Sequence, residues 1–173
     1  AGVSGCVDGF GPGGSLVFKE ARTGGVTTCA LTVEGHVYCW GGGKAGQLGN
    51  DNWVDAPGPQ RMPGELTFAR LAMGFVHGCG IATDGRTWCW GWNARGQLGA
   101  GHTNVHIGPI EVVTPVSFVD ISAGWYHTCG LTADGAAWCW GAGGQGQLGD
   151  GGFQDRPVAV PVAGDLRFAR IAA

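Results

Sequence analysis

Short apolar runs alternate with glycine-rich turns along the chain, and one pattern of apolar and polar positions occurs three times. Residues 129–141 read Cys-Gly-Leu-Thr-Ala-Asp-Gly-Ala-Ala-Trp-Cys-Trp-Gly, and Gly-Gln-Leu-Gly follows at 146–149. Matching stretches stand at 79–91 and 29–41, so each landmark is offset by 50 residues. A fixed period of this size, with short strands and tight turns, predicts an array of β units such as propeller blades.

The period divides the chain into three repeats with a short segment at each end. Residues 1–17 are glycine-rich and are interpreted as a lead-in or partial strand. The predicted blades comprise residues 18–67, 68–117 and 118–167. Residues 168–173 repeat the start of a unit and are predicted to form the first strand of a further blade. The predicted fold class is all-β, with three propeller blades and a stub that form an incomplete array or one completed by other copies.

Each unit is predicted to begin with a strand, at residues 18–24, 68–74 and 118–124. The first copy is more polar, as expected of a terminal repeat that has no preceding neighbour. A hairpin follows, turning at Asp134-Gly135 in the third unit. If its three-residue loop is closed by glycine in the left-handed region, Cys129 lies opposite Cys139 and Trp138 opposite Gly130.

Both faces of this predicted hairpin are apolar, because cysteine and leucine or isoleucine point to one side and aromatic rings to the other. Such a hairpin must be covered on both sides, which suits a blade between two neighbours. The leucines of the Gly-Gln-Leu-Gly motif, Leu48, Leu98 and Leu148, are expected to fill the space between blades. The later part of each unit holds most of the prolines and is predicted to form outer edge strands and loops.

Charge and motif content argue against several functional classes. Only 13% of residues are charged and the net charge is -3, so a basic surface for nucleic acid is lacking. No apolar run approaches the roughly 18 residues of a membrane span. No nucleophile lies in a recognisable elbow, and no glycine-rich segment opens a helix to cradle phosphate. We therefore expect no enzymatic activity, no cofactor and no nucleic-acid partner.

The motif Cys-x-Leu-Thr-x-Asp-Gly-x-x-x-Cys-Trp-Gly, followed by Gly-Gln-Leu-Gly, resembles the repeat of the regulator of chromosome condensation family over residues 18–173. The resemblance implies a seven-bladed propeller of four-stranded blades. Repeats with two cysteines are similar to those of exported bacterial proteins, whereas the eukaryotic nuclear member is a nucleotide-exchange factor for a small GTPase. Three repeats cannot make seven blades, and neither a basic arm nor an inserted wedge is recognisable. Exchange activity is therefore the least favoured function.

Six of the seven cysteines form three Cys-x9-Cys pairs, which fit disulfides, metal ligands or core thiols. Structural zinc sites favour ligands two to four residues apart, a spacing that these pairs lack. The predicted register brings each pair to bridging distance and so favours disulfides and an extracellular location. The predicted bridges are Cys29–Cys39, Cys79–Cys89 and Cys129–Cys139. Cys6 is left over, either as a free thiol or as the site of an intermolecular bridge.

Aromatic residues fall into two groups according to whether they recur with the repeat. Trp40, Trp90 and Trp140 recur and are predicted to lie in the core. The others are candidates for a surface that stacks on a sugar or anchors a protein, although inter-blade packing suits each one singly. These candidates are Trp53, Trp92, Trp125 and Phe153.

Two functional hypotheses remain. The leading one is a non-enzymatic extracellular structural protein whose blade edges join other copies in a ring or filament. The C-terminal stub of one copy, with Phe168, Ala169, Arg170 and Ile171, would add to the N-terminal region of the next, near Cys6. The alternative is a recognition propeller, either as it stands or as a fragment of a seven-bladed protein, that binds a glycan or a protein through its non-repeated aromatic residues.

Overall fold

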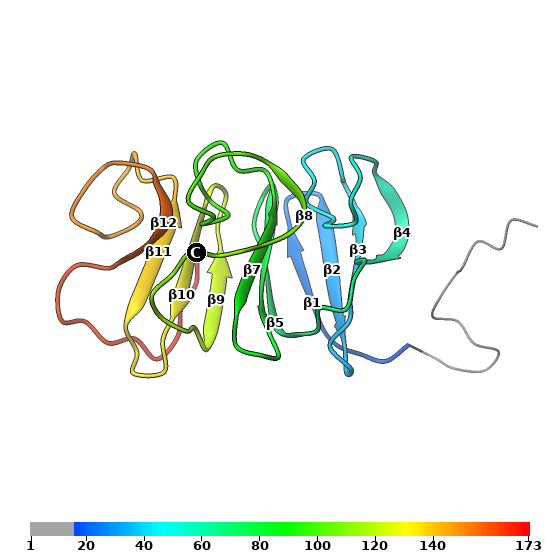
Figure 1. Cartoon of the computed structure of the whole chain (residues 1–173), viewed down its shortest axis with the longest axis horizontal. Helices are drawn as coiled ribbons and strands as arrows, with labels where there is room; N and C mark the ends of the chain where they lie inside the picture. The colour runs from blue at the N-terminus through cyan, green and yellow to red at the C-terminus, as the bar shows by residue number, and fades with distance from the viewer. Residues whose placement is uncertain (1–15) are drawn as a thin grey trace, which may run out of the picture.

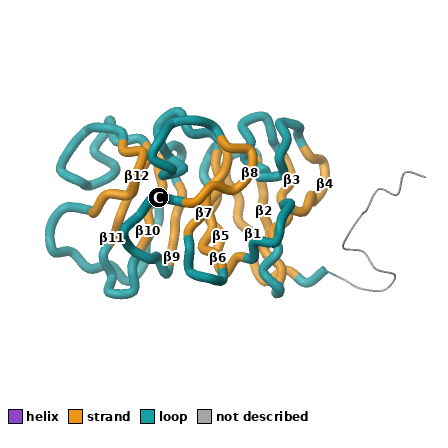
Figure 2. Tube along the Cα trace, in the orientation of Figure 1, coloured by secondary structure: helices purple, strands orange, loops and turns teal. Residues whose placement is uncertain are grey.

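The computed structural model describes residues 16–173, which form twelve strands and no helix (Figures 1 and 2). The strands are β1 Phe18–Gly24, β2 Thr27–Thr32, β3 Val37–Gly41, β4 Ala56–Arg61, β5 Phe68–Met73, β6 His77–Ala82, β7 Thr87–Gly91, β8 His106–Glu111, β9 Asp120–Ala123, β10 His127–Leu131, β11 Ala137–Gly141 and β12 Arg156–Pro161. They build three four-stranded antiparallel sheets in which neighbours in sequence pair with each other. The predicted all-β class is confirmed.

Each sheet is one repeat, so β1 to β4 are named blade 1, β5 to β8 blade 2 and β9 to β12 blade 3. The blades stand side by side with blade 2 between the others, and the row does not close (Figure 1). The first strand of each blade lies at one edge of its sheet and the proline-containing fourth strand at the other, where a missing ladder donor is tolerated. The predicted outer strands are therefore present.

The hairpin register predicted from the turn is also present. In blade 1, Gly35 has a φ of 93° and the Thr32 amide donates to the His36 carbonyl, which closes the three-residue loop. The resulting ladder places the two cysteines of each hairpin directly opposite each other, at Cα–Cα distances of 4.0 to 4.1 Å. The structure contains the disulfides Cys29–Cys39, Cys79–Cys89 and Cys129–Cys139.

Two predicted strands differ in the structure. Strand β9 enters the ladder at Asp120 rather than at Phe118, because its pairing begins after the point where β1 and β5 carry a register shift. The side chain of Phe118 is buried nevertheless. Residues 168–173 form no strand, since the described residues give them no neighbouring strand with which to pair. Cys6 and most of the predicted lead-in lie outside the described residues.

The core lies between the blades rather than inside any one of them. The disulfide and the leucine of one blade pack against the phenylalanine and tryptophan of the next, as Cys29, Cys39 and Leu48 do against Phe68 and Trp90. The same arrangement recurs between blades 2 and 3. Each blade therefore has a disulfide face directed at the following blade and an aromatic face directed at the preceding one. The predicted plugs, Leu48, Leu98 and Leu148, are fully buried.

Candidate interaction surfaces

The two ends of the row present different faces. Blade 3 ends the row with its disulfide face, where Val162 and Ile171 are the only described residues packed against the buried group Cys129, Cys139 and Leu148. Blade 1 ends it with its aromatic face, where Phe18 is 38% exposed and meets Tyr38 edge to face at 5.7 Å. Within the described chain, each end surface is one half of an inter-blade junction.

Side chains at these ends are more exposed than their equivalents in the closed junctions. Trp90 and Trp140 have no exposed surface, whereas Trp40 on blade 1 is only half-buried. Likewise Gln47 and Gln97 are buried, whereas Gln147 on blade 3 is exposed. The presence or absence of a neighbouring blade explains these differences. A neighbouring blade covers the side chains in the closed junctions, whereas no described blade covers those at the two ends of the row.

The C-terminal segment 168–173 lies on blade 3 as the first strand of blade 2 lies on blade 1. The Phe168 amide donates to the Gly135 carbonyl at 2.8 Å, and the Phe68 amide donates to the Gly35 carbonyl at the same distance. The Ala173 amide donates to Ser122 Oγ at 2.8 Å. The segment thus occupies the place of a first strand although it forms no sheet.

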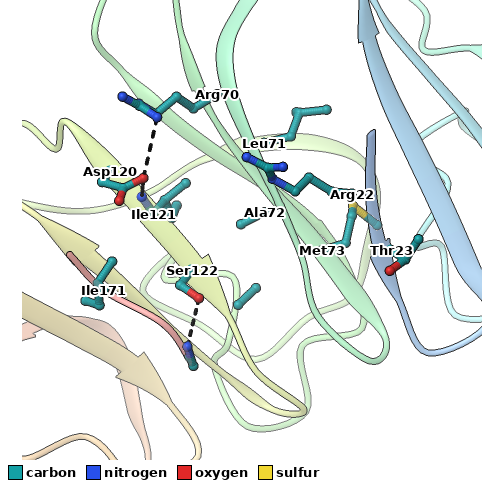
Figure 3. Close-up of a pocket in the computed structure, with 12 residues that line it drawn as sticks. Arg22, Thr23, Arg70, Leu71, Ala72, Met73, Asp120, Ile121, Ser122 and Ile171 are labelled. Atoms are coloured by element: carbon teal, nitrogen blue, oxygen red, sulfur yellow. Dashed lines mark hydrogen bonds and ion pairs between the residues drawn. The ribbon is translucent and has the colours of Figure 1, made fainter. Parts of the chain in front are cut away.

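The first strands of the three blades and this C-terminal segment line one groove of about 340 Å³ (Figure 3). Arg70 of β5 reaches across it to Asp120 of β9, with a nitrogen–oxygen distance of 3.8 Å. Ile171 lies beside β9 in the same view. First strands of neighbouring blades surround the central channel of a propeller, so this groove corresponds to one wall of such a channel.

A buried polar link joins blades 2 and 3. Thr128 Oγ1 donates to the Gln97 carbonyl at 2.9 Å, so His77 Nε2, 2.8 Å from the same hydroxyl, must be the donor to it. His77 is fully buried, and its Nδ1 has no partner among the described residues. Burial, and secondarily the charge of His127, lower the pKa of His77 to about 3. The link is therefore a neutral imidazole with a fixed tautomer.

His127 occupies the same repeat position on the open face of blade 3. It is half-buried and lines a groove of about 710 Å³ together with Trp125, Tyr126, Gln145 and Gln147. Burial lowers the pKa of this histidine also. In this groove Arg95 of blade 2 is paired with Asp155 of blade 3 at 3.0 Å. The groove is polar at its rim and open on the side where a following blade would stand.

The four aromatic residues singled out by sequence are not brought together. Trp125, in the loop between β9 and β10, is 70% exposed and lines the groove on blade 3. Trp53 lies in the loop before β4, Trp92 after β7 and Phe153 before β12, all exposed and outside that groove. The predicted four-residue aromatic surface is thus divided among three blades.

Phe75 was missed by the sequence analysis, although it stacks on Trp125 with ring centroids 5.2 Å apart. Tyr126 meets Phe75 edge to face at 6.4 Å. The sequence does contain a signal that Phe75 belongs with Trp125, since Phe75 stands 50 residues earlier and so occupies the same place in the preceding repeat. These three residues are named the aromatic cluster, and they bridge the loops of blades 2 and 3.

The aspartates of the hairpin turns have structural partners. Asp84 accepts hydrogen bonds from the side chain and amide of Arg86, and these bonds lower the pKa of its carboxyl group. Asp134 accepts a hydrogen bond from Thr132, which lowers its pKa in the same way. Among the described residues no three histidine, cysteine, aspartate or glutamate side chains are grouped to hold a metal ion. The same residues include no helix of the length and apolarity needed to cross a membrane.

The fold is similar to that of several solved structures. Prp20p from Saccharomyces cerevisiae matches with a TM-score of 0.74 and 21% identity, covering 86% of this chain and 39% of that one. Human WBSCR16 matches with a TM-score of 0.80 and 21% identity, covering 91% and 42%. The ectodomain of the Physcomitrella patens receptor kinase CR4 matches with a TM-score of 0.59 and 23% identity, covering 90% and 33%. The chain therefore spans about two fifths of the first two structures.

No curated protein sequence matches the chain significantly. The family model of the regulator of chromosome condensation (RCC1) repeat matches residues 34–79, 84–131 and 134–173, and a second model of that repeat matches residues 68–97 and 118–147. The matches of the first model cover most of the chain, and each runs from the hairpin turn of one blade into the segment that follows that blade, whereas the matches of the second model lie within blades 2 and 3. Prp20p, whose structure was described together with its binding to Gsp1p and histones, is one similar propeller. The chain belongs to the RCC1 repeat family.

Proposed function

We propose that this chain is a non-enzymatic assembly protein that associates head to tail with other copies of itself outside the reducing cytosol. A single observation carries the proposal: the row of blades ends in a disulfide face on one side and an aromatic face on the other. These are the two halves of the junctions that already hold the blades together. An association between unlike faces makes a ring where the rotation closes and a filament where it does not.

The closed junctions supply the template for this contact. Trp90 is fully buried over the Cys29–Cys39 disulfide, and Trp140 lies in the same group as Cys79 and Cys89. By the same geometry, Trp40 of one copy would cover the Cys129–Cys139 disulfide of another. Burial of Trp40 removes apolar surface from water, which favours association.

The C-terminal segment is proposed to complete the blade of the next copy. It stands on blade 3 where β1 of an incoming blade 1 would stand, so only one of the two can occupy the site. At the position of the buried Leu71 and Ile121 the C-terminal segment has Ile171, whereas β1 has Ala21. The C-terminal segment therefore suits the inter-blade position better than β1 does.

Charge favours the same exchange. Arg70 lies 3.8 Å from Asp120, one repeat later along the chain. By repeat position, Asp120 would stand next to the carboxylate of Glu20 of the next copy if β1 kept its place, whereas the C-terminal segment brings the cation Arg170 to that position, although it forms no ion pair with Asp120 within the described residues. Two carboxylates at that distance repel each other, whereas arginine and aspartate attract.

Removal of residues 168–173 tests the proposal. The full chain is expected to sediment as a ring or filament, and the truncated chain as a smaller species, because the shared strand is lost. Ile171→Asp is expected to act like the truncation, since it places a charge against the disulfide group. Leu166→Asp is the matched control, because Leu166 is exposed just outside the segment. Full-length and truncated chains that sediment identically as compact monomers would overturn the idea.

The extracellular location rests on the three disulfides, because such bridges persist in oxidising compartments and are rare in the cytosol. Thiol alkylation of the source cells before lysis, followed by fractionation, tests it. The chain is expected outside the cytoplasm with all three bridges formed. Recovery of the chain in the cytoplasm with the six hairpin cysteines alkylated would contradict the location.

The aromatic cluster supports a second candidate function, recognition of a glycan or a protein. Trp125 presents an exposed ring whose back is held by Phe75, and such a rigid aromatic platform suits stacking on a sugar face. Titration of tryptophan fluorescence with a panel of oligosaccharides, with Trp125→Ala as the test variant and Trp53→Ala as the control, distinguishes this candidate. Binding that Trp125→Ala abolishes and Trp53→Ala preserves would support it.

A further inference from the structure

Two repeat positions decide how a junction is closed. The first is held by Thr27, His77 and His127 on the disulfide faces, and the second by Thr28, Gly78 and Thr128 on the aromatic faces. At each junction the first position of one blade meets the second position of the following blade. The pair between blades 1 and 2 is Thr27 with Gly78, and the pair between blades 2 and 3 is His77 with Thr128.

These two pairs fill the equivalent space between blades in different ways. Thr27 turns its hydroxyl to the Gly42 carbonyl of its own blade at 2.8 Å, and the ring of Trp90 fills the space beside Gly78. The Gln47 carbonyl is then free to accept from Trp90 Nε1 at 3.0 Å. In the other junction the equivalent Gln97 carbonyl accepts from Thr128, which accepts in turn from His77. A histidine at the first position is thus paired with a threonine at the second, and a threonine at the first position with a glycine at the second.

The two open faces carry a matched pair. His127 stands at the first position on blade 3, and Thr28, half-buried and with no side-chain hydrogen bond among the described residues, stands at the second position on blade 1. We infer that in the head-to-tail junction His127 Nε2 of one copy donates to Thr28 Oγ1 of the next, and Thr28 donates to the Gln147 carbonyl. The site is incomplete without the second copy. This inference rests on the proposed function and names the contact that gives it specificity.

The same pairing selects the partner. A blade that presents glycine at the second position, as blade 2 does with Gly78, would leave His127 buried without an acceptor for its N–H group. The aromatic face of blade 3 carries Thr128 but is already covered by blade 2. Within the described chain only the aromatic face of blade 1 both fits His127 and is open, which fixes the order blade 3 to blade 1.

A second contact at the rim agrees with this order. Arg95 of blade 2 pairs with Asp155 of blade 3 at 3.0 Å, while the equivalent positions between blades 1 and 2 are Ala45 and Val105. At the open junction these positions are Gln145 and Asp55 of the next copy. An amide and a carboxylate can form a hydrogen bond, so the rim pair is also compatible.

Single and paired substitutions in the full chain test the inference by analytical ultracentrifugation over a range of concentrations. Thr28→Gly or His127→Thr alone should weaken self-association about 5- to 150-fold, since each leaves the pair mismatched. The double variant His127→Thr with Thr28→Gly recreates the pair found between blades 1 and 2 and should restore association to near the wild-type level. Thr103→Val, which removes an exposed hydroxyl from a loop, is the control.

The outcomes separate this inference from the proposed function. If the wild-type chain associates but the single variants do so equally well, or the double variant is no better than the singles, the His127–Thr28 contact is wrong and head-to-tail assembly stands. If the wild-type chain remains a monomer at all concentrations, the proposed function fails. Each variant is checked for formation of its three disulfides by intact mass, so that loss of association is not loss of folding.

Discussion

The indole Nε1 of Trp90 donates a hydrogen bond of 3.0 Å to the backbone carbonyl of Gln47, in the preceding blade. The ring also packs over the disulfide of that blade and meets Phe68 edge to face at 6.0 Å. One side chain therefore provides both polar and apolar contact between blades 1 and 2.

Trp90→Ala is expected to lower the free energy of unfolding by about 3 to 5 kcal/mol, because it leaves a cavity between two blades. Urea denaturation followed by circular dichroism measures the change. Trp53→Ala, in an exposed loop, should change the free energy by less than about 1 kcal/mol. Equal effects of the two substitutions would contradict the role assigned to Trp90.

Intact mass before and after reduction should differ by six hydrogen atoms, in accordance with three disulfides. Replacement of Cys79 and Cys89 by alanine should lower stability by about 2 to 3 kcal/mol, since a bridge across ten residues restricts the unfolded chain. The measurement is urea denaturation without reductant. An unchanged mass on reduction would remove both the bridges and the main support for an extracellular location.

Gly80 lies across the strand pair from Trp88, and a Cβ at this position would come within 2.5 Å of the Phe68 ring. Gly80→Ala should therefore cost about 1 to 3 kcal/mol of stability through overpacking. Gly58→Ala is the matched control, because nothing lies within 4 Å of a Cβ there. A neutral Gly80→Ala would show that the blade relaxes around the added methyl group.

Acidification should destabilise the protein through His77. Its pKa is about 3 in the folded state and about 6.5 when unfolded, so between these values the unfolded chain binds more protons. The contribution of this histidine is thus fully present above pH 6.5 and falls by about 1.4 kcal/mol for each pH unit below it. Denaturation of wild type and His77→Gln at pH 7 and pH 5 should show the smaller loss in the variant. Equal losses would mean that His77 is already protonated in the folded state.

Contacts within a hairpin could be predicted from the sequence, because the length of the turn fixes them. The Cys29–Cys39 and Trp138–Gly130 pairings follow from a three-residue loop and the two-residue period of a strand. Contacts between blades could not be predicted in this way. His77 and His127 stand in the same local sequence context, yet one is fully buried and the other half-buried, because of the two blades that carry them only the blade of His77 is followed by another in the described chain.

Dependence on contacts between blades also explains why the C-terminal segment and the aromatic cluster in the loops could not be predicted. Residues 168–173 have the sequence of a first strand, but strand structure requires a partner, which the described residues do not supply. The stacking of Phe75 on Trp125 joins loops of two blades and depends on their spacing, which a single repeat does not specify.

Every disulfide in the described part of the chain closes a loop inside one hairpin, so the main chain is the only covalent connection from blade to blade. Under a pulling force the blades would therefore detach one after another, as separate mechanical units. In each unit the bridge keeps the nine residues between its cysteines from being extended, which shortens the reach of that unit by roughly 30 to 35 Å. An assembly of such blades would yield in small, regular increments, and a reducing agent would lengthen each increment without changing their number.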